Sequence, residues 1–121
     1  MSVNIWKIPQ TDLAVSRIAY GCANLAAWNQ EAIGADDAAN AARLIHTARD
    51  NGITLFDHAD LYAFGKAEVL FGQILSQSPG LRNQIVIQSK CGQQLPQGWK
   101  PGSPIAIDLS REHISSEISP P

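Results

Sequence analysis

Two short apolar runs, each ending on a charged residue, constrain the fold of this chain most strongly. The first covers residues 53–57 and ends at Asp57, and the second covers residues 85–90 and ends at Lys90. The first run is apolar on both faces, as parallel strands covered by helices are, and the second is rich in β-branched residues. A helical pattern lies between the two runs. This order predicts a parallel α/β arrangement with right-handed crossovers.

Helical patterns fill the segments around these runs. The first predicted helix is capped by Asp36 or Asp37 and ends at Asn51-Gly52. Its apolar residues recur at i, i+3, i+4 and i+7, which is the spacing of one helix face; they are Ala41, Leu44, Ile45 and Ala48. A second helix is predicted over about residues 66–78, before Pro79-Gly80, and a third begins at Asp108 or Ser110.

The two ends of the array are less regular. Residues 4–8 and 16–20 are strand-like and flank turn residues, which predicts an amino-terminal hairpin over about residues 4–20. The second of these runs is alternatively the first strand of the α/β array, whose βα units then cover about residues 16–118. Residues 92–107 are rich in proline and glycine and predict a long irregular loop, a kind that is often functional.

Composition excludes two classes of partner. With 121 residues and a net charge of -2, the chain has the size of about one small domain and no basic stripe for nucleic acid. No segment approaches the roughly 18 apolar residues of a membrane span, and the first ten residues lack the pattern of a secretory signal. We therefore expect a cytoplasmic protein with Cys22 and Cys91 reduced.

Three titratable side chains are expected to meet at one edge of the sheet. Asp57 and Lys90 occupy the carboxyl ends of two predicted parallel strands, where ligands bind in such folds. Neighbouring strands lie about 4.8 Å apart, so the two side chains can pair. Tyr62 follows Asp57 by five residues. A nearby cation stabilises phenolate over phenol, which makes Tyr62 a candidate general acid. The alternative is that these residues have only structural roles: Asp57 as a cap, Tyr62 in the core and Lys90 as a solvated charge.

The same residues resemble a known enzyme family. The resemblance is carried by the run FDHADLYAFGKAEVLFGQIL followed by IVIQSKCG. It is similar to the aldo-keto reductase pattern: a strand ending in Asp, a Tyr five residues later, a G-x-x-E-x-x-x-G helix and a strand ending in Lys. RIAYGCANLAAWN resembles the family's first strand and loop, and DLSREHI resembles the start of a later helix. The match covers about residues 5–118, and DHADLY and SKCG are most similar to bacterial oxidoreductases resembling YdhF.

This resemblance implies a fold and a reaction. The fold would be the incomplete amino-terminal portion of a (β/α)8 TIM barrel with an amino-terminal β-hairpin. The reaction would be NADPH-dependent reduction of an aldehyde or ketone, a small-molecule carbonyl substrate, to an alcohol. By position, Tyr62 would protonate the carbonyl oxygen, Lys90 would tune Tyr62, and Asp57 would pair with Lys90.

The resemblance also implies binding residues. Gly21 and Cys22, together with Asp57, would lie beside the nicotinamide and its ribose. The substrate pocket would be lined by Trp28, Phe64 and Trp99. The long loop after Lys90 is expected to vary in this family.

The chain also departs from the family pattern. The fourth catalytic residue, a His at the end of the fourth strand, is absent, and barrels of this type need roughly 250 residues. We therefore expect a truncated reductase domain over residues 1–121 that is inactive alone. The alternative is a non-catalytic module that binds a complementary carboxyl-terminal fragment or another copy of itself through its uncovered sheet edge.

A metal-dependent hydrolase is the competing enzyme hypothesis. Asp57, His58 and Asp60 would supply its ligands at one strand end. A metal site needs ligands from several strands and partners that orient them, whereas only this cluster offers any. We therefore expect no metal at these residues and a packing role for His58.

Overall fold

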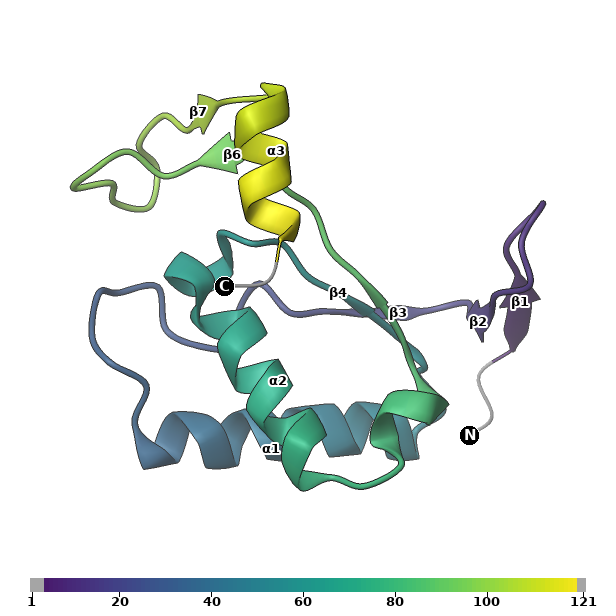
Figure 1. Cartoon of the computed structure of the whole chain (residues 1–121). Coiled ribbons are helices and arrows are strands. Elements are labelled where there is room, and N and C mark those ends of the chain that lie inside the picture. The colour runs from purple at the N-terminus through teal and green to yellow at the C-terminus, as the bar shows by residue number, and fades with distance from the viewer. Residues whose placement is uncertain (1–3, 120–121) are drawn as a thin grey trace.

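The computed structural model describes residues 4–119 and contains a parallel sheet covered by helices on one side (Figure 1). The sheet has the order β3-β4-β5, and both of its strand pairs are parallel. Its elements are β3 (Ala19–Gly21), α1 (Ala35–Asp50), β4 (Leu55–Asp57), α2 (Lys66–Gln77) and β5 (Val86–Gln88). The predicted alternation of strands and helices is thus confirmed from residue 19 to residue 88.

The amino-terminal hairpin is shorter than predicted. β1 (Ile5–Lys7) pairs antiparallel with β2 (Ala14–Ser16), so the second hairpin strand is not residues 16–20. Residues 19–21 form β3 instead, which was the alternative interpretation of that run. The reason is the turn over residues 8–13, which is closed by a hydrogen bond from Ile8 N to Leu13 O and leaves Ala14 in register with Lys7.

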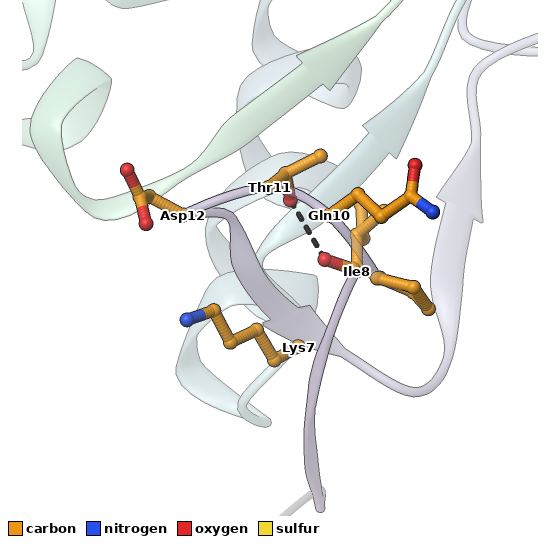
Figure 2. Close-up of a pocket in the computed structure, with 6 residues that line it drawn as sticks. Lys7, Ile8, Gln10, Thr11 and Asp12 are labelled. Atoms are coloured by element: carbon orange, nitrogen blue, oxygen red, sulfur yellow. Dashed lines mark hydrogen bonds between the residues drawn. The ribbon is translucent and has the colours of Figure 1, made fainter.

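This turn encloses a hollow of about 410 Å³ lined by residues 7–12 (Figure 2). Thr11 Oγ1 donates a hydrogen bond of 2.8 Å to Ile8 O across it. The hairpin leads into the amino end of β3 and is tied to β4 by a reciprocal pair of bonds: Ser16 N donates to Thr54 Oγ1, and Thr54 N donates to Ser16 Oγ. The hairpin therefore covers the end of the sheet opposite to Asp57.

The helices α1 and α2 lie on the same side of the sheet and form the core with it (Figure 1). The predicted apolar faces are correct, because Ala41, Ile45 and Ala48 of α1 are buried. The buried residues of α2 are Ala67, Leu70, Phe71 and Ile74, and Phe56 of β4 lies beneath them. The ring centroids of Phe56 and Phe71 are 5.3 Å apart.

The start of α1 differs from the prediction. Gly34, not Asp36 or Asp37, is the residue that caps the helix. Asp37 stands three positions later and accepts a hydrogen bond of 2.8 Å from Gly34 N. A carboxylate at this third position satisfies a backbone N–H that lies ahead of the helix and also favours the positive end of the helix dipole.

The segment after β5 is more ordered than the predicted irregular loop. It contains a two-stranded antiparallel ladder, β6 (Gln93–Gln94) and β7 (Ala106–Ile107), followed by α3 (Arg111–Ile118). Ser110 caps α3 by accepting from His113 N, as one of the two predicted starts required. No residue of α3 is fully buried. Among the helices in residues 4–119, none has the length and apolar content to cross a bilayer.

Candidate active site

Asp57 and Lys90 meet at the carboxyl ends of the parallel strands, as their sequence positions predicted. Lys90 Nζ lies 2.8 Å from Asp57 Oδ1 and 2.9 Å from Asp57 Oδ2. The same ammonium donates to the carbonyl oxygen of His58 at 2.8 Å. The Lys90 side chain is 46% exposed and that of Asp57 is 28% exposed, so the pair opens to solvent on one side. A small molecule can therefore approach it.

Tyr62 is the third member of this cluster. It begins the short 3-10 helix η1 (Tyr62–Gly65), and Lys90 Nζ lies 5.1 Å from the centre of its ring. Partial burial acts to lower the pKa of Lys90, but the hydrogen bond to Asp57 and the contact with Tyr62 outweigh burial and raise that pKa above the ordinary lysine value. Lys90 therefore stays charged beside the phenol. A cavity of about 330 Å³ is lined by both Tyr62 and Lys90.

The backbone that carries Tyr62 is strained. Ala63 has φ 51° and Phe64 has φ 60°, so two residues with side chains adopt the left-handed conformation, and Gly65 follows at φ 87°. Such residues cost of order 1–3 kcal/mol each and persist where the surroundings determine the conformation. The surroundings here include the fully buried side chain of Ala63 and a hydrogen bond from Phe64 N to Leu61 O. These contacts hold the strained turn between Tyr62 and α2 in place.

Gln88 is a member of the cluster that the sequence analysis missed. Its Nε2 donates to Asp57 Oδ1 at 2.8 Å, so this carboxylate oxygen accepts from both Gln88 and Lys90. Gln88 is the last residue of β5, is paired in register with Asp57, and precedes Lys90 by two residues. That spacing was the available signal. Gln88 orients the carboxylate that holds Lys90.

Gly21 and Cys22 lie beside Asp57, but in different ways. Gly21 is paired in register with Asp57, is exposed, and has no atom within 4 Å of the position that a Cβ would take. Cys22 N donates to Asp57 O at 2.9 Å, whereas its side chain is buried in the core. Burial, aided by the charge of Asp57, raises the pKa of the Cys22 thiol to about 12. Cys22 thus offers the site its backbone and not its sulfur.

The three aromatic residues proposed to line a substrate pocket come together. The ring centroids of Trp28 lie 6.0 Å from Phe64 and 5.7 Å from Trp99, and those of Phe64 and Trp99 are 6.0 Å apart. All three line one cavity of about 610 Å³. Trp28 is oriented by its indole N–H, which donates to Ala23 O at 2.8 Å. The Trp28 ring also contacts Tyr62, at a centroid distance of 6.4 Å.

The ligands of the alternative metal hydrolase do not form a cluster. Within residues 4–119, Asp60 groups with His113 and Glu117, and neither Asp57 nor His58 joins that group. Asp57 is engaged by Lys90, and His58 is 1% exposed with its ring 4.5 Å from that of Phe71. Among the described residues, neither ring nitrogen of His58 has a hydrogen-bond partner, and burial lowers the pKa of His58. His58 packs as a neutral core residue.

Comparison with known sequences gives one family. Residues 17–119 match the sequence model of the Aldo/keto reductase family. The chain is 41% identical over 108 residues to the uncharacterized oxidoreductase YcsN of Bacillus subtilis. This match covers 88% of this chain and 34% of that protein. The chain is also 33% identical over 118 residues to the 6-dehydroglucose reductase of Novosphingobium aromaticivorans. This match covers 93% of this chain and 34% of that protein.

Comparison with solved structures gives the same result. The glycerol dehydrogenase AKR11B4 of Gluconobacter oxydans superposes with a TM-score of 0.76 at 30% identity, over 97% of this chain and 34% of that one. The aldo-keto reductase AKR11C1 of Bacillus halodurans, in its holo form, superposes with a TM-score of 0.70 at 28% identity. The match covers 94% of this chain and 33% of that one. The chain thus spans about a third of the length of these relatives. Its sheet is part of a (β/α)8 barrel, as predicted.

Proposed function

This chain belongs to the aldo/keto reductase family, and on that premise we propose that it contributes the amino-terminal part of the active site of a cytoplasmic NADPH-dependent carbonyl reductase. The substrate class is an aldehyde or ketone, which is reduced to the alcohol. The observation that carries the proposal is the cluster of Asp57, Lys90 and Tyr62 at the carboxyl ends of β4 and β5. Active sites of (β/α)8 barrels lie at this face.

Each member of the cluster has one task. Tyr62 donates its phenolic proton to the carbonyl oxygen as negative charge develops there. Lys90 stabilises the phenolate that this transfer leaves behind, because its ammonium lies 5.1 Å from the ring and remains protonated. Asp57 holds the ammonium through two contacts below 3 Å. Positioning and a matched proton donor are what a protein supplies when a cofactor carries the hydride.

The described residues fit one side of a nicotinamide. Gly21 is exposed and a side chain at its position would meet nothing within 4 Å, so a flat ring has room against the backbone of β3. Asp57, in register with Gly21, is placed to accept from a ribose hydroxyl. NADPH, when bound, would supply the hydride. Gly21, the Cys22 backbone and Asp57 would orient it.

Substrate selection is assigned to the aromatic cavity. Trp28, Phe64 and Trp99 present three ring surfaces close to Tyr62, which favours a substrate with an apolar portion next to its carbonyl group. Trp28 and Phe64 come from loops that are tied together: Lys66 Nζ, at the start of α2, donates to Asn29 Oδ1 at 2.9 Å. This contact holds the Trp28 loop against the Tyr62 turn.

The remaining strands of the barrel are needed to complete this site. They would be supplied by the rest of the same polypeptide or by a complementary fragment that pairs with the open edges of the β3-β4-β5 sheet. Residues 1–121 provide only three strands of the barrel sheet, so we expect them to be inactive in carbonyl reduction on their own.

The test replaces the matching third of the Gluconobacter glycerol dehydrogenase with residues 1–121 and assays the chimaera. Tyr62→Phe is expected to lower kcat for carbonyl reduction by at least about 100-fold, because the proton donor is lost, while NADPH affinity stays within about twofold. Tyr20→Phe is the matched control, since Tyr20 lies in β3 and packs on Phe56. Wild-type turnover in the Tyr62→Phe chimaera would contradict the proposal.

A further inference from the structure

Lys66, the first residue of α2, makes contacts that its place in the helix does not explain. A lysine at the first position of a helix lies at the positive end of the helix dipole, where a cation is unfavourable. Its ammonium reaches another segment instead: Nζ donates to Asn29 Oδ1 at 2.9 Å and to Glu31 O at 3.2 Å. Lys66 therefore joins α2 to a loop that lies 35 residues or more before it in the chain.

This loop, residues 22–34, connects β3 to α1 and contains only turns, bends and irregular backbone (Figure 1). Asn29 is its point of attachment. The Oδ1 atom of Asn29 accepts from Lys66 Nζ and also from Glu31 N at 3.1 Å, so one oxygen holds both the helix and the loop backbone. Asn29 N donates to Ala27 O at 2.9 Å. A loop without strand or helix pairing depends on such contacts to keep one conformation.

Trp28 immediately precedes Asn29 and is positioned by the same loop. Its indole N–H donates to Ala23 O, which belongs to the loop and therefore does not fix the loop relative to α2. Phe64, by contrast, stands two residues before Lys66 in the strained turn. The rings of Trp28 and Phe64 line the aromatic cavity with their centroids 6.0 Å apart. Lys66 thus ties the segment that carries one ring to the segment that carries the other.

We propose that Lys66 is a specificity-determining residue: it sets the spacing of Trp28 and Phe64 and so favours carbonyl compounds that carry a ring. This inference rests on the carbonyl reduction proposed above. A cavity of about 610 Å³ with aromatic walls suits a flat ring, which packs against those walls, whereas a short aldehyde contacts little of them. Lys66 acts through the position of the walls and has no part in the proton transfer.

The first test measures the position of Trp28 in the 121-residue chain. Trp6→Phe and Trp99→Phe leave Trp28 as the single tryptophan and keep an aromatic ring at each position. In that background, Lys66→Met should raise the acrylamide quenching constant of Trp28 at least about twofold, because the loop opens to solvent more often. Lys7→Met, on the exposed strand β1, is the matched control and should leave quenching unchanged. Equal quenching with and without Lys66→Met would overturn the inference.

The second test measures substrate selection in the chimaera described above. Lys66→Met should raise KM for benzaldehyde at least about fivefold, while KM for acetaldehyde and kcat for both aldehydes stay within about twofold. A general loss of structure would affect both substrates alike. Asn29→Ala should have the same effect, and the double variant should be no worse than either single variant, because both changes remove one shared contact.

Two kinetic results would contradict the inference. One is an active chimaera in which Lys66→Met leaves KM for benzaldehyde unchanged, and the other is an equal rise in KM for both aldehydes. A wild-type chimaera that reduces neither aldehyde would instead contradict the proposed function, and the specificity role would fall with it. If Lys66→Met fails to fold, Asn29→Ala decides the question by the same two measurements, since it removes the acceptor and leaves the sequence of α2 unchanged.

Discussion

The βα core and the segment from residue 91 to residue 119 differ in how they are held in place. In the core, Phe56, Ile45 and Leu70 are each 0% exposed and belong to one apolar cluster. Between residues 91 and 119, no apolar side chain is fully buried, and the larger ones, such as Ile107 at 71%, are open to solvent. Within that segment Asp108 N donates to Gly92 O at 2.9 Å, and Trp99 packs against Trp28 and Phe64.

The functional residues divide between these two regions. Gly21 and Asp57 are the last residues of β3 and β4, and Tyr62 and Lys90 follow β4 and β5, so their relative positions are set by the core. Trp99 and His113 lie in the exposed segment. The residues proposed for proton transfer are therefore positioned by the packed sheet, whereas Trp99, which is proposed to contact the substrate, is positioned by the exposed segment.

The largest expected effect is on the free energy of unfolding, and it tests whether the core is packed more tightly than the segment from residue 91 to residue 119. Phe56→Ala removes a side chain packed on Tyr20 and Phe71 and should lower the free energy of unfolding by about 3–5 kcal/mol, or abolish the folded state. Ile107→Ala, at an exposed position of β7, should change it by less than about 0.5 kcal/mol. Urea unfolding followed by circular dichroism measures both. Equal shifts would show that the two regions are packed alike.

A smaller effect of pH is expected at His58, the polar residue on the core side of the site. Burial lowers its folded pKa, so its neutral form stabilises the fold above the unfolded value of 6.5, and that contribution is lost as the pH falls below it. The free energy of unfolding should therefore drop as the pH falls below about 6.5. His58→Leu should show a shallower drop, since the ionisable carboxylates are common to both proteins. Parallel curves would mean that His58 is not buried as a neutral group.

Much of the core was predictable because its signal is local. The polar residues that end the two apolar runs, Asp57 and Lys90, indicated the edge of the sheet that carries the candidate site, and the helix periodicity of residues 41–48 indicated its packed face. Strand pairing follows from such patterns when the connections are short. The resemblance carried by the Tyr62 turn supplied the expected barrel, which the comparisons with solved structures confirm.

The features that were missed depend on contacts distant in sequence or on backbone geometry. Ala63 and Phe64 adopt left-handed conformations that neither residue type favours, and only Gly65 beside them gave a hint. The ladder between β6 and β7 forms across a gap of about a dozen residues, and β6 consists of two glutamines, which are not strong strand formers. His113 was noted only as a helical residue, because its proximity to Asp60 exists only once α3 is placed over the β4 end.

Native-state hydrogen exchange tests most directly the claim that the packed core positions the catalytic groups. The amides of Cys22, His58 and Asp60 donate to Asp57 O, Gln88 O and Lys90 O respectively. They should exchange at least about 100-fold more slowly than the amides of residues 106–118, because opening them requires the sheet to separate. If they exchange as fast as the amides of α3, the catalytic edge is not part of the stable core, and the account is wrong.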